Sequence, residues 1–256
     1  MQQLRRLSGR RAARSEEGSF VIDGPTLLAE ALDAGVAVVE VFAAPGAEGD
    51  LLARVEATGA AVHPVTAEVL ARATDAVAPN GLAAIARRIE VPVAEAVRAA
   101  AGGPLAVVLA EVSDPGNAGT LVRAAEAAGA VAVLFTAGSV DPTNPKCVRA
   151  AAGSLFRLPV AIGGEATEVL DELRAAGVQT AATVVRDGVP YDEADLRGPL
   201  ALVLGSEAHG LPREVVDAVD LRLTIPMAGR AESLNVAMAG AVVCFEALRQ
   251  RRTAAG

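Results

Sequence analysis

Short runs of apolar residues, hardly interrupted by polar ones, recur through the chain after residue 104. Two of them, LAVVLAEV at 105–112 and VAVLFT at 131–136, flank a segment with a helical pattern, TLVRAAEAAG. Strands with one face in solvent alternate apolar and polar residues, whereas parallel strands covered on both faces are apolar throughout. Such runs, alternating with helices, predict an α/β fold built on a parallel sheet. Further strands are expected at 158–162, 178–185, 200–204 and 221–225, and a last helix at 234–250.

The first part of the chain has the pattern of a separate, smaller α/β unit. FVIDG at 20–24 predicts a strand, and PTLLAEALDAG after it predicts a helix, with Pro at its start and Gly at its end. GLAAIARR at 81–88 closes the unit as a strand. The next segment ends in Gly-Gly-Pro, which indicates a linker. The predicted organisation is an N-terminal domain over 1–91, a linker over 92–103 and a larger domain over 104–256.

The cysteines and the hydropathy pattern bear on the compartment. Cys147 and Cys244 lie far apart and form no CxxC motif, so we expect neither a disulfide framework nor a metal site. No window has 18 uninterrupted apolar residues, and the basic N-terminus lacks the apolar core of a signal peptide. These features predict a cytoplasmic protein without a membrane span.

The charge is unevenly distributed. The net charge of −8 argues against indiscriminate binding of nucleic acid, but the first 14 residues carry five arginines and no acid. The rest of the chain has 18 basic and 31 acidic residues. A basic arm on an acidic body can still touch phosphates locally. With one Tyr, five Phe and no Trp, a base-stacking platform is not expected. The candidate phosphate contacts are Arg5, Arg6, Arg10 and Arg11.

Three polar loops each follow a predicted strand of the larger domain. SDPGNAGTLVR occupies 113–123, GSEAHGLP occupies 205–212 and PMAGRAESLN occupies 226–235. Ligands of open parallel sheets bind beyond the carboxyl ends of the strands, which is where these loops are expected. The small residues suit a pocket lined by backbone groups. The polar side chains available there are Asn117, Arg123, Ser206, Glu207, Ser233 and Asn235.

Each loop also has a simpler explanation when it is taken alone. DPGN before a helix is commonly a turn and cap, and Ser206-Glu207 is equally a cap with a first-turn acid. We expect Arg123 near the first turn of its helix, Ser233 as an N-cap and Asn235 two residues inside the last helix. That helix also has an apolar stripe, which predicts core packing or a subunit interface. The stripe consists of Leu234, Met238, Ala241, Phe245 and Leu248.

Several common catalytic motifs are missing from the sequence. Neither domain has a GxGxxG after its first strand, and there is no GxxxxGK[ST] phosphate loop. There is no GxSxG elbow, and His63 and His209 have no evident Ser or Cys nucleophile as partner. No group of His, Cys and Asp residues has the spacing of a metal site.

Together the three loops resemble the three motifs of the SpoU (TrmH-like) branch of the SPOUT RNA methyltransferases. The matching text is NAGTLVRAAEAAG, LVLGSEAHGLP and IPMAGRAESLNVAMAGAVVCFE, and DPTNPKCVRAAAGSLFRLPV at 141–160 is similar to the segment between them in that family. FVIDGPTLLAEAL at 20–32 resembles the start of the small L30e-like substrate-binding domain that often precedes the catalytic domain. The resemblance implies a C-terminal SPOUT α/β domain with a deep trefoil knot over 200–240, although knots are rare.

The resemblance further implies that S-adenosylmethionine binds in the knot, held mainly by backbone groups. Gly205, Ile225 and Leu234 would contact it, with Leu204, Pro226 and Met227 nearby. Members of the family are generally dimers whose sites are completed across the interface. The apolar stripe of the last helix is compatible with that.

The implied reaction is methyl transfer to a ribose 2′-hydroxyl of RNA. By motif, Arg123 is the principal catalytic residue. Because arginine hardly deprotonates in proteins, we expect it to pair with an RNA phosphate and stabilise the forming alkoxide. Asn117 would orient Arg123 or the ribose, Glu207 would hold the arginine or the nucleotide, and Ser233 and Asn235 would surround the reacting hydroxyl. Arg149 is a further candidate phosphate contact.

The function that the sequence predicts is 2′-O-methylation of ribosomal RNA of the 23S type. A tRNA methyltransferase is the alternative within the class, and the two-domain layout favours rRNA. An antibiotic-resistance role through rRNA methylation is a narrower possibility. A catalytically silent RNA-binding scaffold and a nucleotide-binding α/β protein unrelated to RNA are alternatives from other classes. Deletion of 1–14 is expected to weaken RNA binding and flatten its dependence on salt.

Overall fold

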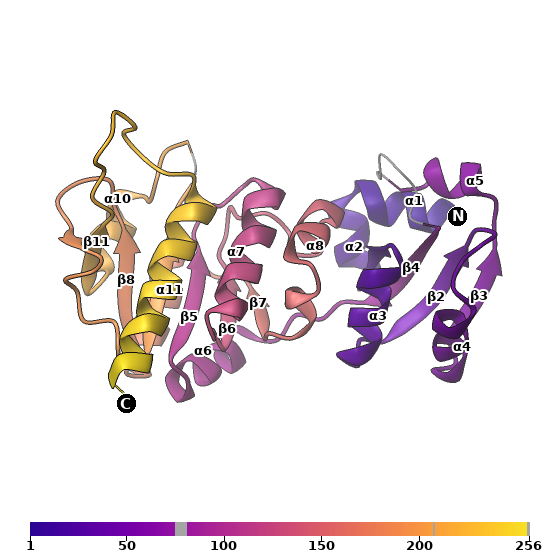
Figure 1. Ribbon diagram of the computed structural model, residues 1–256, viewed down its shortest axis with the longest axis horizontal. Helices are drawn as coiled ribbons and strands as arrows, with labels where there is room; N and C mark the ends of the chain where they lie inside the picture. The colour runs from indigo at the N-terminus through magenta and orange to yellow at the C-terminus, as the bar shows by residue number, and fades with distance from the viewer. Residues whose placement is uncertain (75–80, 207, 255–256) are drawn as a thin grey trace. The chain divides into compact units, whose positions relative to one another are not determined.

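A computed structural model describes residues 1–74, 81–206 and 208–254 (Figure 1). The chain forms two compact units. Unit 1 contains residues 1–89 together with 141–157, and unit 2 contains residues 90–140 together with 158–256. No helix among the described residues is both long enough and apolar enough to cross a membrane.

Unit 1 is built on a four-stranded sheet with the order β1-β4-β2-β3. Strands β1 (Ser19–Asp23), β4 (Leu82–Arg87) and β2 (Val38–Ala43) pair antiparallel, and β3 (Ala61–Pro64) adds parallel to β2. The small α/β unit that the sequence predicts is confirmed. Its helices are α1 (Gln2–Gly9), α2 (Arg11–Glu17), α3 (Pro25–Asp33), α4 (Gly49–Ala57), α5 (Ala67–Ala71) and α8 (Pro145–Ala151), followed by the 3₁₀ turn η1 (Ser154–Phe156).

The first 14 residues are folded and do not form a free basic arm. Leu4 and Leu7 on α1 are fully buried and belong to one apolar cluster with Phe42 and Ile85 of the sheet. Each such leucine stabilises the unit by roughly 1.5–3 kcal/mol. Deletion of 1–14 is therefore no test of RNA binding, because it removes part of the core. Single substitutions of exposed arginines are the appropriate replacement.

A buried ion pair joins the segment 141–157 to the N-terminal part of unit 1. The Nε atom of Arg14 donates to Oδ2 of Asp141 over 2.7 Å, and each side chain is only 3% exposed. Oδ1 of Asp141 also accepts from the backbone N–H and the hydroxyl of Thr143, at 2.9 and 2.6 Å. Burial alone raises the pKa of Asp141, but the hydrogen bonds from Thr143 and Arg14 and the charge of Arg14 outweigh it and hold that pKa below its usual value.

Unit 2 contains a seven-stranded sheet with the order β7-β6-β5-β10-β8-β11-β9, in which all neighbours pair in parallel. The predicted parallel α/β fold is thus confirmed, while the knot expected over 200–240 stays a prediction. The short strand β9 was not anticipated. The strands are β5 (Leu105–Leu109), β6 (Ala132–Phe135), β7 (Val160–Ile162), β8 (Gln179–Thr183), β9 (Val189–Pro190), β10 (Leu200–Leu204) and β11 (Leu221–Thr224).

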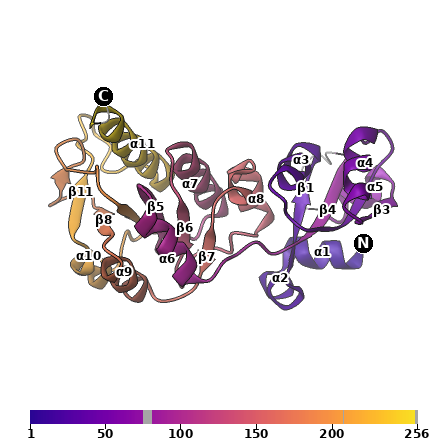
Figure 2. The same ribbon diagram turned by 90° about the horizontal axis from the view of Figure 1, so that it is seen from below.

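Helices cover both faces of this sheet, as the apolar strands require. Helices α7 (Pro115–Ala127) and α11 (Val236–Ala254) lie side by side on one face. Helices α6 (Val93–Gly102), α9 (Ala166–Ala175) and α10 (Arg213–Ala218) pack on the other (Figure 2). The segment 92–103, expected as a linker, instead forms α6. Its Ala96, Val97 and Ala100 are buried in the core, so the Gly-Gly-Pro sequence ends a packed helix.

Candidate functional site

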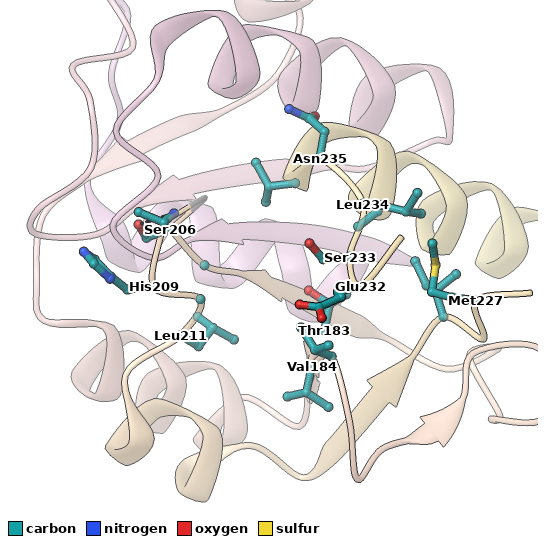
Figure 3. A pocket seen from close by; sticks show the side chains of 17 residues that line it. Thr183, Val184, Ser206, His209, Leu211, Met227, Glu232, Ser233, Leu234 and Asn235 are labelled. Atoms are coloured by element: carbon teal, nitrogen blue, oxygen red, sulfur yellow. Dashed lines mark hydrogen bonds between the residues drawn. The ribbon is translucent and has the colours of Figure 1, made fainter. Parts of the chain in front are cut away.

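A pocket of about 400 Å³ lies at the carboxyl edge of the sheet in unit 2 (Figure 3). It is lined from the ends of β8, β10 and β11, which are neighbours or next neighbours in the sheet, and from the chain that leads into α11. This is the edge at which the sequence predicts a ligand site. Predicted residues that line it are Gly205, Ile225, Met227, Ser233, Leu234 and Asn235.

The loop after β10 is closed tightly on itself. Ser206 and Gly210 exchange backbone hydrogen bonds of 3.0 and 2.9 Å, and Gly210 has a φ of +70°. A Cβ atom on Gly205 would lie 2.6 Å from both the carbonyl carbon of Gly210 and the nitrogen of Leu211. Backbone atoms cannot move aside as a flexible side chain can. Gly205 therefore permits the closed loop, and the wall it forms presents backbone groups to the pocket.

The start of α11 differs from the prediction. The helix begins at Val236, and Asn235 is its N-cap: the side-chain oxygen of Asn235 accepts from the backbone N–H of Ala237 at 2.9 Å and of Met238 at 3.4 Å. Asparagine is among the best N-cap residues, so the cap falls there and not on Ser233. Ser233 is consequently free of the helix and lines the pocket.

Two predicted residues from distant parts of the chain meet at this helix start. Because the oxygen of Asn235 faces the helix N–H groups, its NH₂ group points outward and donates to the side-chain oxygen of Asn117 over 3.0 Å. Asn117 lies in the first turn of α7, where its backbone N–H donates to the N-cap Asp114 at 2.7 Å. The Asn117–Asn235 bond thus joins the beginnings of α7 and α11.

Arg123 lies apart from these residues. Helix α7 begins at Pro115, so Arg123 is in its third turn and not near the first as expected. Six residues separate it from Asn117, which corresponds to about 9 Å along the helix and roughly 120° around it. The side chain is exposed, is not part of the pocket wall, and makes no hydrogen bond or ion pair with the residues that the structure describes.

The remaining residues predicted for this site have mixed outcomes. Leu204 is fully buried at the end of β10, directly before the loop that begins at Gly205, and it does not line the pocket. Pro226 lies between the lining residues Ile225 and Met227 but does not itself line the pocket. Glu207 falls outside the described residues. Among residues 1–74, 81–206 and 208–254, no group of three or more His, Cys, Asp or Glu residues is placed to hold a metal ion.

The predicted RNA contacts lie in unit 1. Arg5, Arg6, Arg10 and Arg11 are all exposed, although Arg6 pairs with Glu17. Arg149 is partly buried, and its Nη1 atom lies 3.5 Å from Oδ2 of Asp23. Burial raises the pKa of Asp23, and the charge of Arg149 partly offsets that rise. The guanidinium of Arg149 is thus already engaged with a carboxylate inside the unit.

Some of the residues that line the pocket are not among those predicted from the sequence. Thr183 and Val184 come from the end of β8, and Glu232 comes from the segment just before Ser233. The run at 178–185 was predicted as a strand of the same sheet, so the rule that ligands bind at the carboxyl edge applied to it as well. Thr183 is the polar residue at that end and could have been found in this way.

Comparison with known proteins adds independent support to this geometry. The model of the SpoU rRNA Methylase family matches residues 104–245, and that of the MRM3-like substrate binding domain matches residues 1–84. The chain is 33% identical over 232 residues to the 23S rRNA (guanosine(2553)-2′-O)-methyltransferase RlmP of Bacillus subtilis. The matched region covers 91% of this chain and 89% of that protein.

Two solved structures are similar over nearly the whole chain. The AdoMet-bound rRNA methyltransferase from Sinorhizobium meliloti has a TM-score of 0.86 and 33% identity, covering 97% of this chain and 94% of that one. The SpoU methyltransferase AviRb from Streptomyces viridochromogenes, in complex with AdoMet, has a TM-score of 0.87 and 27% identity, covering 98% of both chains.

Proposed function

Because the chain belongs to the SpoU rRNA methylase family, we propose that it transfers the methyl group of S-adenosylmethionine to a ribose 2′-hydroxyl of 23S-type ribosomal RNA. The observation that carries this proposal is the pocket at the carboxyl edge of unit 2, with its wall of small residues and its two joined helix starts. A relative that matches nine-tenths of the chain bears the name of a 23S rRNA 2′-O-methyltransferase. The match of residues 1–84 to a substrate-binding domain favours rRNA over the tRNA alternative.

The pocket suits S-adenosylmethionine, which supplies an already activated methyl group on a sulfonium. Its volume of about 400 Å³ is in the range of small-molecule sites. The absent side chain of Gly205 lets the loop close against Gly210 and Leu211, and all three residues line the pocket. We assign the cofactor contacts to Gly205, Ile225, Met227 and Leu234, with Leu204 and Pro226 shaping the wall behind them.

The polar residues beside the pocket would position the ribose. Ser233 lines the pocket, and Asn235 is held by its cap bonds and by Asn117, so its orientation is fixed before RNA binds. Fixed donors and acceptors of this kind align a hydroxyl without reorganisation during the reaction. Arg123 would bind an RNA phosphate and stabilise the alkoxide that forms as the hydroxyl loses its proton. Glu207 keeps its proposed role of holding the arginine or the nucleotide.

A homodimer is part of the proposal. The stripe predicted on the last helix is not part of the buried core: Met238 is 62% and Phe245 47% exposed, and Leu234, Ala241 and Leu248 are half-buried, while Gly240, Cys244 and Ala247 turn inward. An apolar stripe of this kind on a long helix is suited to a second copy of the chain. Since Arg123 does not reach the pocket of its own chain, we propose that it serves the pocket of the partner subunit.

Unit 1 would bind RNA through the exposed arginines of α1, of α2 and of the turn between them. Arg5 and Arg6 lie on α1, Arg11 lies on α2 and Arg10 lies between the two helices, which the core holds in place. Arg149 is a weaker candidate, because its pairing with Asp23 must be given up or shared. A cytoplasmic location accompanies this proposal and is supported by two buried free cysteines, Cys147 and Cys244.

The proposal is tested by mapping 2′-O-methyl groups in total RNA from cells with and without the gene. We expect one or a few large-subunit rRNA nucleotides to lose the modification and to regain it when the wild-type chain is restored. Purified protein should incorporate labelled methyl groups into unmodified 23S-type rRNA in preference to tRNA. Loss confined to tRNA would establish the alternative, and no loss in any RNA would contradict methyl transfer.

A smaller test concerns the 205–211 loop. The Gly205→Ala substitution is expected to weaken S-adenosylmethionine binding at least about tenfold, because the new methyl group meets the backbone of Gly210 and Leu211 at 2.6 Å and must open the loop. Isothermal titration measures this. Gly198→Ala is the matched control, since a Cβ at Gly198 meets nothing within 4 Å. Unchanged affinity in Gly205→Ala would exclude the loop from the cofactor site.

A further inference from the structure

Glu232 places a carboxylate in the wall of the pocket. It lies in the segment between β11 and α11, just before Ser233. Thr183, at the end of β8, lines the same pocket, and Figure 3 labels both side chains in its wall. Neither side chain makes a hydrogen bond or an ion pair with the part of the chain that the structure describes. Two oxygen acceptors are therefore presented together to whatever fills the pocket.

The charge of the pocket lining indicates what kind of ligand the pocket binds. Among the described lining residues Glu232 is the sole carboxylate, and no lysine or arginine lines the pocket to balance it. A carboxylate that becomes desolvated when a ligand enters must gain a cation or several hydrogen bonds, or binding is penalised. The lining therefore selects a ligand that brings its own positive charge to this point. S-adenosylmethionine brings two, a sulfonium and an α-ammonium.

We propose that Glu232 and Thr183 together bind the α-ammonium group of the methionine part of S-adenosylmethionine. This assignment rests on the proposed function. An ammonium has three N–H donors and no acceptor, so it matches a pocket whose wall offers both a carboxylate and a hydroxyl oxygen. A sulfonium has no donor and gives the Thr183 hydroxyl nothing to accept. A ribose diol would use both oxygens but would leave the charge of Glu232 unneutralised.

The test measures affinity and does not depend on turnover. Isothermal titration is carried out with S-adenosylmethionine, with S-adenosylhomocysteine, which keeps the ammonium but lacks the sulfonium, and with 5′-methylthioadenosine, which lacks both. Glu232→Gln keeps the size of the side chain and removes its charge. We expect about tenfold to a hundredfold weaker binding of the first two ligands and less than about twofold change for the third, as for loss of one charge-assisted hydrogen bond.

Two further variants sharpen the result. Thr183→Val should weaken the same two ligands by about threefold to tenfold, because the ammonium loses a hydrogen bond to a neutral hydroxyl, which contributes less than the bond to the carboxylate. Glu214→Gln is the matched control: it removes an exposed carboxylate of α10 that does not line the pocket, and it should leave all three affinities unchanged. The melting temperature of each variant shows whether it is folded.

The possible outcomes separate the alternatives. Equal weakening of all three ligands by Glu232→Gln would place the carboxylate at the ribose, and weakening of S-adenosylmethionine alone would place it at the sulfonium. Either result overturns the proposal, as does unchanged affinity for all three. If the wild-type chain binds the cofactor as predicted but methylates no RNA, the proposed function fails while the assignment of Glu232 stands.

Discussion

Replacement of Arg123 with alanine should reduce methyl transfer about a thousandfold or more and leave the affinity for S-adenosylmethionine within about twofold. The two effects separate because Arg123 is exposed on α7 and does not line the cofactor pocket. Loss of one preorganised group that stabilises developing negative charge typically costs a factor of about 10²–10³, and loss of a phosphate contact adds to it. Single-turnover transfer to a verified RNA and isothermal titration measure the two quantities.

Arg123→Lys is the informative companion variant. Lysine keeps the positive charge but loses the planar fork of donors that binds phosphate at two points, so partial recovery of activity is expected. Arg213→Ala is the control, because Arg213 is also a helical arginine, with its side chain 93% exposed, but it lies on α10. Near-normal turnover of Arg123→Ala would contradict its assignment to catalysis.

A mixing experiment shows whose pocket Arg123 serves. Arg123→Ala chains keep an intact pocket, and Gly205→Ala chains keep the arginine, so neither homodimer should be appreciably active when the cofactor concentration is well below the dissociation constant of Gly205→Ala. If the arginine acts across the interface, each mixed dimer has one complete site. Random pairing would then restore about one quarter of the wild-type activity, since half of the dimers are mixed and each has one working site of two. No recovery would indicate that each Arg123 acts on its own chain.

The second large effect is on stability. Asp141→Asn should lower the free energy of unfolding of unit 1 by about 3–5 kcal/mol, because Arg14 keeps its charge in a buried position and loses its counter-ion. Urea denaturation followed by tryptic cleavage within unit 1 measures this loss. Asp33→Asn is the control: its ion pair with Arg54 is exposed, and its loss should cost less than about 1 kcal/mol.

The same pair predicts a dependence on pH. The pKa of Asp141 is lower in the folded than in the unfolded chain, so its contribution is fully present above the unfolded value of about 3.9 and is lost as the pH falls through the folded value. The difference in stability between the wild type and Asp141→Asn should therefore be constant near neutrality and shrink below about pH 4. A difference that persists to pH 2 would contradict the ion-pair explanation.

The parts of the fold that the sequence predicts correctly are those determined by the local pattern of apolar and polar residues. Uninterrupted apolar runs identify β5, β6 and β10 as strands buried on both faces, and the edge rule then places Gly205 and Ile225 at the same edge of the sheet. The errors arose where contacts distant in sequence decide the outcome. Nothing local distinguishes α6 from a linker, or shows that Leu4 and Leu7 complete a core with strands more than 30 residues away.

In the candidate site, too, some residues are predictable from the local sequence and others depend on distant contacts. Motif spacing identified Asn117 and Asn235, which the structure joins by a hydrogen bond. It could not show that Asn235 takes the cap and leaves Ser233 to the pocket, because both residues are good caps. It placed Arg123 one or two turns too early, since the helix start at Pro115 depends on the capping bond to Asp114. Thr183 ends a strand outside the three loops, and Glu232 lies inside the third loop without a role implied by the motif, so the pocket geometry was needed to identify both.

The return of residues 141–157 to unit 1 has a consequence for synthesis on the ribosome. All four strands of the sheet are complete once residue 87 has emerged, yet Arg14 has no carboxylate until Asp141 is made. At typical elongation rates, the 54 intervening residues take about 3–11 s. During that interval Arg14 lacks the carboxylate that neutralises it in the complete unit. A fragment that ends at residue 91 would remain permanently in this condition, so a stable excised domain requires residues 141–157 to be grafted onto it.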